Sequence, residues 1–264
     1  MSTMPASLIS LVIGVSVGLS AGYLGSLMVL KKMALVGDAL SHVALPGLAL
    51  GILLSFNPFI GAFAFLFGCA LIVWRIERIT RLPIETIVGA MFTLALAVGI
   101  LIIPETDLLE ALFGDITKVT LLDAAIAAVV AASAVLLTRA IYRKMILSMI
   151  SEELATSSGV NVANTNLVYL LLVSLVVAIG IKIVGSLLVG FLVIVPAATA
   201  RTLSSNLYRY SMLSSVFGIV SALSGVLLSG YLQLPPGPLV VLSGIAVFLT
   251  TVTMKWASSM TERA

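Results

Sequence analysis

Charged residues are scarce in this sequence. Aspartate, glutamate, lysine and arginine together supply 9% of its 264 residues, whereas ordinary soluble domains contain about 25%. Hydrophobic residues supply 61%, and apolar runs of the roughly 20 residues that cross a bilayer recur along the chain with only short breaks. The composition excludes a soluble globular domain and gives no reason to expect a nucleic-acid partner. It predicts a multi-pass protein embedded in a lipid membrane.

Histidine and cysteine each occur once, as His42 and Cys69. One cysteine cannot form an intrachain disulfide, and packing is the expected role of Cys69 in its apolar run. One histidine argues against an intramembrane metalloprotease, which needs a H-E-x-x-H type pair of ligands and a catalytic glutamate. The Walker A pattern G-x-x-x-x-G-K-[ST] is also absent. The chain is therefore not expected to be an enzyme, and any ATP hydrolysis has to come from a partner.

Nine apolar segments are candidate membrane-spanning helices. They predict an all-α fold, a polytopic transmembrane helix bundle of eight to nine spans, with residues 1–264 forming a single transmembrane domain. The weakest division is the hairpin over residues 164–200, whose turn is predicted at "GIKIVG". The nine segments are roughly residues 8–30, 34–56, 59–74, 84–103, 119–138, 164–181, 183–200, 211–232 and 238–254.

The basic residues orient this bundle, because cytoplasmic connections carry an excess of lysine and arginine. With the N-terminus outside and the C-terminus inside, only two of the 14 basic residues, Lys118 and Lys182, fall on the outer side. The opposite orientation would place all the others outside. The basic residues on the predicted inner side are Lys31, Lys32, Arg75, Arg78, Arg81, Arg139, Arg143, Lys144, Arg201, Arg209, Lys255 and Arg263.

Small residues recur every four positions in the first segment, at Ser10, Gly14, Gly18, Gly22 and Ser26. Residues at this spacing form one stripe on a helix, and small side chains there let two helix backbones approach closely. The stripe predicts tight packing within the subunit, with a subunit interface as the alternative.

The longest outer connection, "PETDLLEALFGDITK", carries four acidic residues around an apolar "LLEALF" that predicts a short interfacial helix. Two interpretations stay open for it. It is either a solvated loop or a docking surface for an extracellular partner.

The only long inner connection contains the sequence "SEELATSSG". Ser151 is a good N-cap, Glu152 and Glu153 place negative charge in the first turn, and Gly159 supplies a left-handed stop. This pattern predicts a helix of about two turns, with Leu154 on its apolar side. A helix this short is marginal alone in water, so we expect it to pack against its own spans or against a cytoplasmic partner.

Asp38 and His42 lie inside the second apolar segment, four residues apart. On a helix this spacing places both side chains on one face, with Cβ atoms about 5 to 6 Å apart. His42 is about 12 Å into the span, where an ionisable group costs at least about 2.5 kcal/mol and normally faces the bundle interior or a water-filled path. One interpretation is an internal pair that fixes helix packing. The other is a binding site, because carboxylate and imidazole suit divalent metals such as Zn²⁺ or Mn²⁺.

Two prolines predict breaks in the helices beside this pair. Pro46 cannot donate the amide that would bond the His42 carbonyl, and Gly47 permits a bend. Pro196 does the same for the carbonyl of Leu192, and Thr199 can lend a hydroxyl there. We expect these features to line a cavity.

The stretch "GDALSHVALPGLALG" resembles the signature of the ABC-3 family, the membrane permease subunits of zinc, manganese and iron ABC importers. The stretches "ETIVGAMFTLALAVGILI", "EELATSSGVNV" and "KIVGSLLVGFLVIVPAATAR" are similar to later blocks of that family, in the same order. The resemblance runs from about residue 8 to residue 254 and includes the specific Asp-x-x-x-His block.

This resemblance implies one half of a homodimeric pore in the cell membrane, with no permanently bound cofactor. Two copies of a separate cytoplasmic ABC ATPase would bind inside, and an extracytoplasmic metal-binding protein would deliver the ion. Asp38 and His42 match the positions implicated in metal passage, and the segment from Glu152 to Gly159 matches the place of the coupling helix. The transported ion would be Zn or Mn.

Two other kinds of transporter remain as alternatives. A permease for vitamin B12 or ferric siderophores would carry a large organic cargo, but such permeases are usually longer and lack the Asp-x-x-x-His block. An ion-coupled secondary transporter would use Asp38 as a proton or sodium site. Such a carrier would transport alone, whereas an ABC permease needs its ATPase.

Overall fold

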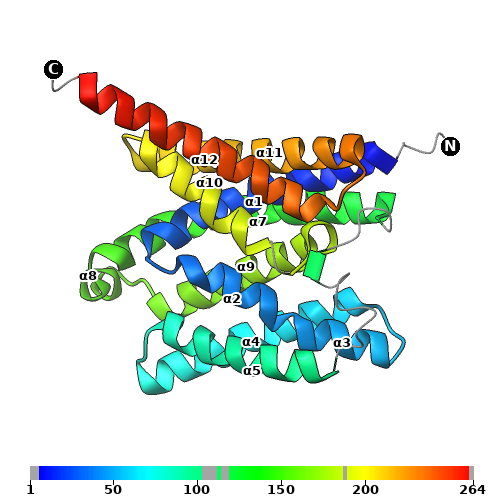
Figure 1. Cartoon of the computed structure of the whole chain (residues 1–264). Helices are drawn as coiled ribbons and strands as arrows, with labels where there is room; N and C mark the ends of the chain where they lie inside the picture. The colour runs from blue at the N-terminus through cyan, green and yellow to red at the C-terminus, as the bar shows by residue number, and fades with distance from the viewer. Residues whose placement is uncertain (1–5, 103–111, 114–118, 187–188, 262–264) are drawn as a thin grey trace.

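The computed structural model describes residues 6–102, 112–113, 119–186 and 189–261, and every regular element in these ranges is an α-helix (Figure 1). The all-α prediction is therefore confirmed. The acidic residues of the predicted outer connection and most of its "LLEALF" lie outside the described residues. The helices are α1 (Ala6–Leu30), α2 (Ala34–Val43), α3 (Leu45–Leu53), α4 (Pro58–Thr80), α5 (Ile84–Ile102), α7 (Leu121–Ile150), α8 (Glu152–Ser157), α9 (Val162–Val184), α10 (Val189–Leu203), α11 (Leu207–Leu232) and α12 (Pro236–Thr261).

Eight helical segments of the described chain are long and apolar enough to cross a membrane, with α2 and α3 together forming one of them. The seventh of the nine predicted spans, residues 183–200, needs correction. Helix α9 runs on to Val184 and ends at Gly185, whose φ of 82° only glycine adopts easily. Helix α10 starts later and has 15 residues, about 22 Å of helix against a hydrocarbon core of about 30 Å.

Helix α7 is longer than the predicted span, which ended at residue 138. It has 30 residues and continues through Arg139 to Ile150. Beyond the apolar run its basic side chains Arg143 and Lys144 are exposed, whereas Met145 is fully buried. A helix needs only one apolar face to pack, so the charges that end the hydropathy signal do not end the helix.

The small-residue stripe of α1 packs against α11 (Figure 1). A Cβ atom on Gly18 would lie 2.4 Å from the Gly218 carbonyl oxygen, and one on Gly22 would lie 2.4 Å from the Ser214 carbonyl oxygen. The Ser214 hydroxyl donates to the Gly22 carbonyl at 2.5 Å. The two backbones are in direct contact, which confirms the predicted packing within the subunit.

Gly18→Ala should destabilise the protein by about 1 to 3 kcal/mol, because the added methyl group meets backbone that cannot rotate away. Thermal unfolding of the purified chain in detergent measures the effect. The matched control is Gly68→Ala in α4, where a Cβ atom would have no atom within 4 Å, so the unfolding temperature should hold or rise slightly. An equal loss in both variants would show that the α1–α11 contact is not the cause.

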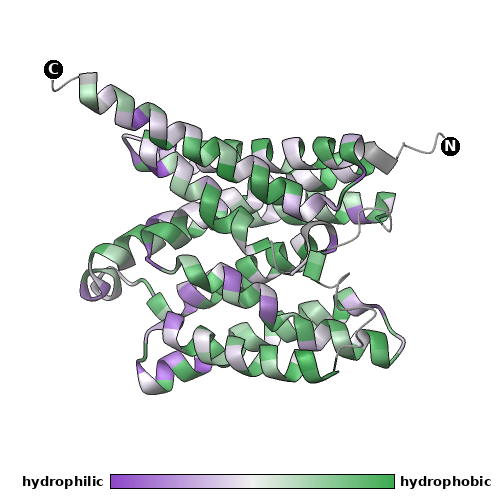
Figure 2. Cartoon of the chain, viewed as in Figure 1, coloured by the Kyte–Doolittle hydropathy of each residue, from purple (hydrophilic) through white to green (hydrophobic). Residues whose placement is uncertain are grey.

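The two ends of the bundle differ in polarity. Helix α1 begins at one end and α12 finishes at the other, which also carries α8 (Figure 1). Hydrophilic residues gather mainly at this second end (Figure 2), which we call the α8 end. It includes the α4–α5 turn, with Arg78 and Arg81 beside it, and the α10–α11 turn, between Arg201 and Arg209. By the positive-inside rule the α8 end is predicted to face the cytoplasm.

Candidate functional site

The second span is interrupted where Pro46 predicts a break. Helix α2 ends at Val43 and α3 starts at Leu45, with Pro46 in its first turn, the position where a helix tolerates proline. The His42 carbonyl would accept a hydrogen bond from the residue at position 46 in a continuous helix, but Pro46 has no N–H to donate. The Ala44 N–H faces this carbonyl instead, and a contact between residues two apart is weaker than the lost helical bond.

Gly47 has a different role from the one the sequence indicates. It lies inside α3 and not at the break, and a Cβ atom on it would lie 2.2 Å from the Gly61 carbonyl oxygen of α4. Its missing side chain lets α3 and α4 pack backbone to backbone. On the other side, Gly99 of α5 makes room for Leu45 and for the ring of Pro46.

Asp38 and His42 share one face of α2, in the interior of the bundle. Asp38 is half-buried against the start of α10, where a Cβ atom on Gly190 would lie 2.5 Å from its carboxylate oxygen. His42 is 8% exposed, and its ring centroid lies 5.3 Å from that of Phe92 in α5. The pair therefore sits where α2, α5 and α10 meet.

The two side chains are not bonded to each other. Within the described residues His42 Nδ1 is buried without a hydrogen-bond partner, and no hydrogen bond or ion pair joins the imidazole to the Asp38 carboxylate. The neighbouring Ser41 hydroxyl donates to the Asp38 backbone carbonyl at 2.6 Å, so it does not compete for the carboxylate. A pair whose purpose is to fix helix packing would be bonded. This arrangement leaves donor atoms available to a ligand.

The described residues of one chain hold no complete metal site. In the part of the chain that the structure describes, no three residues among His, Cys, Asp and Glu cluster closely enough to hold an ion. Zn²⁺ usually takes four ligands, and Mn²⁺ takes more. Asp38 and His42 would give two side chains, so an ion bound there would need further ligands from water, backbone or a second copy of the chain.

Pro196 lies inside α10, six residues beyond Gly190, which is about 9 Å along a helix. The side chains of Pro196 and Thr199 are buried, and the Thr199 hydroxyl donates to the Val195 carbonyl at 2.8 Å. That hydroxyl is therefore engaged with its own helix. It is Gly190, and not Pro196, that the structure brings against Asp38.

The predicted inner helix is present as α8. The Ser151 hydroxyl accepts from the Leu154 N–H at 3.2 Å, and Gly159 follows the helix with a φ of 78°. Ser151 is also the C-cap of α7, so the two helices meet at one residue without a linker.

Helix α8 is anchored on one side and open on the other. Ala155 is fully buried, whereas Leu154 is 56% exposed, and Glu152 and Glu153 are exposed beside it. The helix contacts α7 and α9, which confirms the expectation that it packs on its own spans. The expected contact with a cytoplasmic partner stays a prediction, and Leu154 is the exposed apolar side chain available for it.

A polar network that the sequence did not reveal joins the end of α1 to α4 and α9, close to α8. The Lys31 ammonium donates to the side-chain carbonyl of Asn166 in α9, and the Asn166 amide donates to Glu77 of α4 at 2.9 Å. Burial lowers the pKa of Lys31, and the carboxylates of Glu77 and Glu152 partly raise it again. The sequence feature that could have indicated this network is Glu77, an acid that lies between basic residues at the end of a span.

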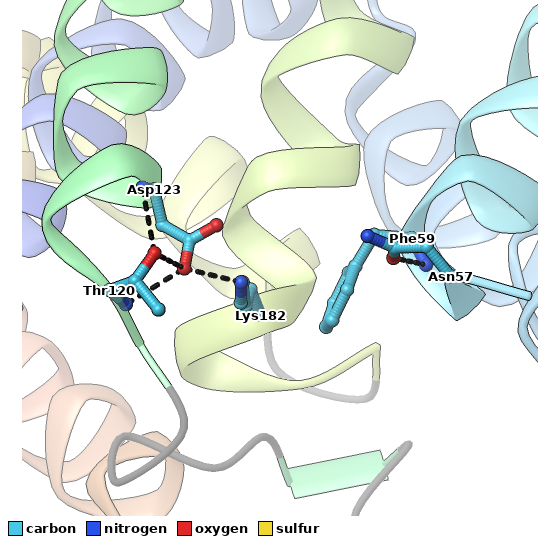
Figure 3. Close-up of polar contacts among 5 residues, drawn as sticks. All are labelled: Asn57, Phe59, Thr120, Asp123 and Lys182. Carbon is cyan, nitrogen blue, oxygen red and sulfur yellow. Dashed lines mark hydrogen bonds and ion pairs between the residues drawn. The ribbon is translucent and has the colours of Figure 1, made fainter.

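At the opposite end of the bundle Lys182 is neutralised (Figure 3). Its Nζ lies 2.5 Å from Asp123 Oδ2 and 5.0 Å from the ring centroid of Phe59. Asp123 also closes a capping box with Thr120 at the start of α7. These residues edge a largely apolar hollow of about 370 Å³ between α4, α7 and α9. One of the two basic residues predicted to lie outside is thus paired and adds no net charge there.

Residues 4–255 match the family model described as the ABC 3 transport family. The chain belongs to this family. The resemblance of its Asp-x-x-x-His stretch is therefore confirmed, and the eight apolar helices are those of a multi-pass cell-membrane protein of the ABC 3 family.

Relatives within this family cover nearly the whole chain. A manganese transport system membrane protein, MntC of Listeria innocua, is 34% identical over 90% of this chain and 87% of its own length. A high-affinity zinc uptake system membrane protein, ZnuB of Buchnera aphidicola, is 33% identical over 89% of this chain and 93% of its own length. The solved structure of PsaBC from Streptococcus pneumoniae in complex with Fab superposes with a TM-score of 0.79, with 32% identity over 92% of this chain and 89% of that one.

Proposed function

We propose that this chain is the membrane permease subunit of an ABC importer that moves a divalent transition-metal ion, manganese or zinc, into the cytoplasm. The observation that carries the proposal is the Asp38–His42 pair, whose donor atoms lie in the bundle interior without bonding each other. Relatives named for manganese transport and for zinc uptake support the cargo class.

The transported ion is the substrate of these residues. The Asp38 carboxylate offsets the charge of an ion that has lost part of its hydration shell, and His42 adds a nitrogen ligand suited to borderline metals. Two chains related by a twofold axis would bring two of each residue to a central path, which completes a four-ligand set. For this reason we propose a homodimer.

The energy for transport would come from a partner subunit that binds at the α8 end. No ATP-binding motif occurs in the sequence, so a separate cytoplasmic ABC ATPase supplies the energy, and an extracytoplasmic metal-binding protein supplies the ion. Leu154 of α8 is the proposed contact with the ATPase, flanked by Glu152 and Glu153. The Lys31–Asn166–Glu77 network next to α8 then ties that contact to α1, α4 and α9.

Reconstituted vesicles test this function. The chain is inserted with its ATPase, the loaded metal-binding protein is added outside, and uptake of radioactive manganese or zinc is followed with and without ATP. Uptake that needs both ATP and a hydrolysis-competent ATPase supports the proposal. Uptake by the chain alone under a proton or sodium gradient would instead establish a secondary carrier, and uptake of a metal chelate but not the free ion would establish the other class of ABC permease.

Pro46→Ala tests the break beside the pair. The substitution returns a backbone donor to the His42 carbonyl but removes the ring that packs near Gly99, so the two effects on stability should largely offset each other. Uptake should fall, because Asp38 and His42 sit on the helix whose direction the break sets. A variant with normal stability and wild-type uptake would show that the break is not needed for transport. Uptake assays and thermal unfolding of the same preparation separate the outcomes.

A further inference from the structure

The α10–α11 turn at the α8 end borders a small open pocket that is partly polar. Its volume is about 310 Å³, and it lies between the end of α1 and the turn itself. Unlike the hollow beside Lys182, it is lined largely by polar groups. These are Arg201 from α10, the turn residues Ser204, Ser205 and Asn206, and Tyr210 from α11.

The start of α11, where Asn206 and Leu207 line the pocket, has backbone donors that no helical bond uses. The Asn206 side chain accepts from the Arg209 N–H at 2.8 Å, and its backbone carbonyl accepts from the Tyr210 N–H at 2.9 Å. The N–H groups of Leu207 and Tyr208 precede the first helical hydrogen bond and have no acceptor within the helix. The helix has 26 residues, so the positive end of its dipole adds to these two donors.

A second observation, independent of the helix start, points to a ligand: the buried side chain of Tyr210. Its side chain is 3% exposed, and within the described residues its buried hydroxyl has no hydrogen-bond partner of regular geometry. The Arg201 guanidinium lies near that hydroxyl. A buried hydroxyl that donates to no acceptor is costly, and Tyr210 lines the pocket together with a guanidinium and two serine residues.

We propose that this pocket binds a phosphate group. A guanidinium, hydroxyl donors and a helix N-terminus are the groups that recognise phosphate oxygens, and the described lining residues include no acid that would repel them. The apolar side chains at the mouth favour a phospholipid headgroup as its source. Leu203, Leu207 and Tyr208 are 46%, 43% and 65% exposed, as expected at the boundary between hydrocarbon and headgroups.

Native mass spectrometry of the full chain tests the proposal, with phosphatidylglycerol titrated against diacylglycerol of the same acyl chains, which lacks only the phosphate headgroup. Phosphatidylglycerol should bind and diacylglycerol should not. Arg201→Gln should weaken phosphatidylglycerol binding at least about tenfold, and Tyr210→Phe, which removes one buried hydroxyl and keeps the ring, about threefold or more. The matched control is Arg209→Gln, which removes an exposed cation of the same turn that does not line the pocket.

A second arm adds inorganic phosphate, without lipid, to the wild type and to the same variants. Phosphate binding that depends on Arg201 and Tyr210 supports the pocket with free phosphate as a ligand, and displacement of the lipid by phosphate assigns both to one place. Three results would overturn the proposal: equal binding of diacylglycerol, equal losses in Arg201→Gln and Arg209→Gln, or no binding in either arm. Binding that needs the ATPase subunit would assign the pocket to a protein contact instead, and would overturn it as well.

Discussion

Replacing Asp38 with asparagine, or His42 with alanine, is expected to abolish metal uptake, with losses beyond the roughly 100-fold seen when only a supporting contact of a metal ligand is removed. Asparagine keeps the volume of Asp38 but removes the charge that compensates a partly dehydrated cation. Alanine removes the only imidazole of the chain. Uptake of radioactive manganese or zinc into reconstituted vesicles measures both effects.

Assembly and ATPase binding should survive these substitutions, because within the described residues no hydrogen bond or ion pair between these two side chains holds the fold together. The control is Ser41→Ala, a buried residue of the same helix whose hydroxyl bonds only the backbone of α2. Its uptake should stay near that of the wild type. If Asp38→Asn and His42→Ala both transport at the wild-type rate, the pair serves packing and the proposed path is refuted.

Leu154→Asp should uncouple ATP hydrolysis from transport. Leu154 is the exposed apolar side chain of α8, and an aspartate there adds a third acid beside Glu152 and Glu153. Placing an unpaired charge at the centre of a protein contact costs several kcal/mol, so stimulation of the ATPase by the loaded metal-binding protein should be lost. The ATPase rate of the reconstituted complex is the measurement.

Leu154→Met is the matched control for this variant, because it keeps an apolar side chain of similar volume. Stimulation should be retained with methionine and lost with aspartate. The folded bundle should be unaffected in both, since the buried anchor of α8 is Ala155. Unchanged stimulation and normal uptake in Leu154→Asp would mean that α8 faces solvent, and the coupling role would be wrong.

The sequence predicts the helices of this protein better than their ends. Hydropathy marks a span only while both faces of the helix are apolar, so the predicted segments stop at Arg75 and Arg139. The helices themselves continue to Thr80 and Ile150, because one buried face is enough outside the bilayer. Short α8 was predicted closely, since its cap and its glycine stop are local signals.

The candidate site, too, was predicted only in part from the sequence. The Asp38–His42 pair is visible in the sequence because both residues lie on one helix at a spacing of four. Gly190 and Phe92, which contact the pair, come from other helices, and no local pattern reports such a contact. The Lys31–Asn166–Glu77 network was missed for the same reason: its members come from three different helix ends, and Glu77 alone does not indicate its partners.

The length of α7 and its junction with α8 have a mechanical consequence. Thirty helical residues make a rod of about 45 Å, about 15 Å more than the hydrocarbon core. A single residue, Ser151, joins the rod to α8, so there is no slack between them. We therefore expect a displacement of α8 to pass directly into α7, and from α7 to α1 and α9, which pack along it.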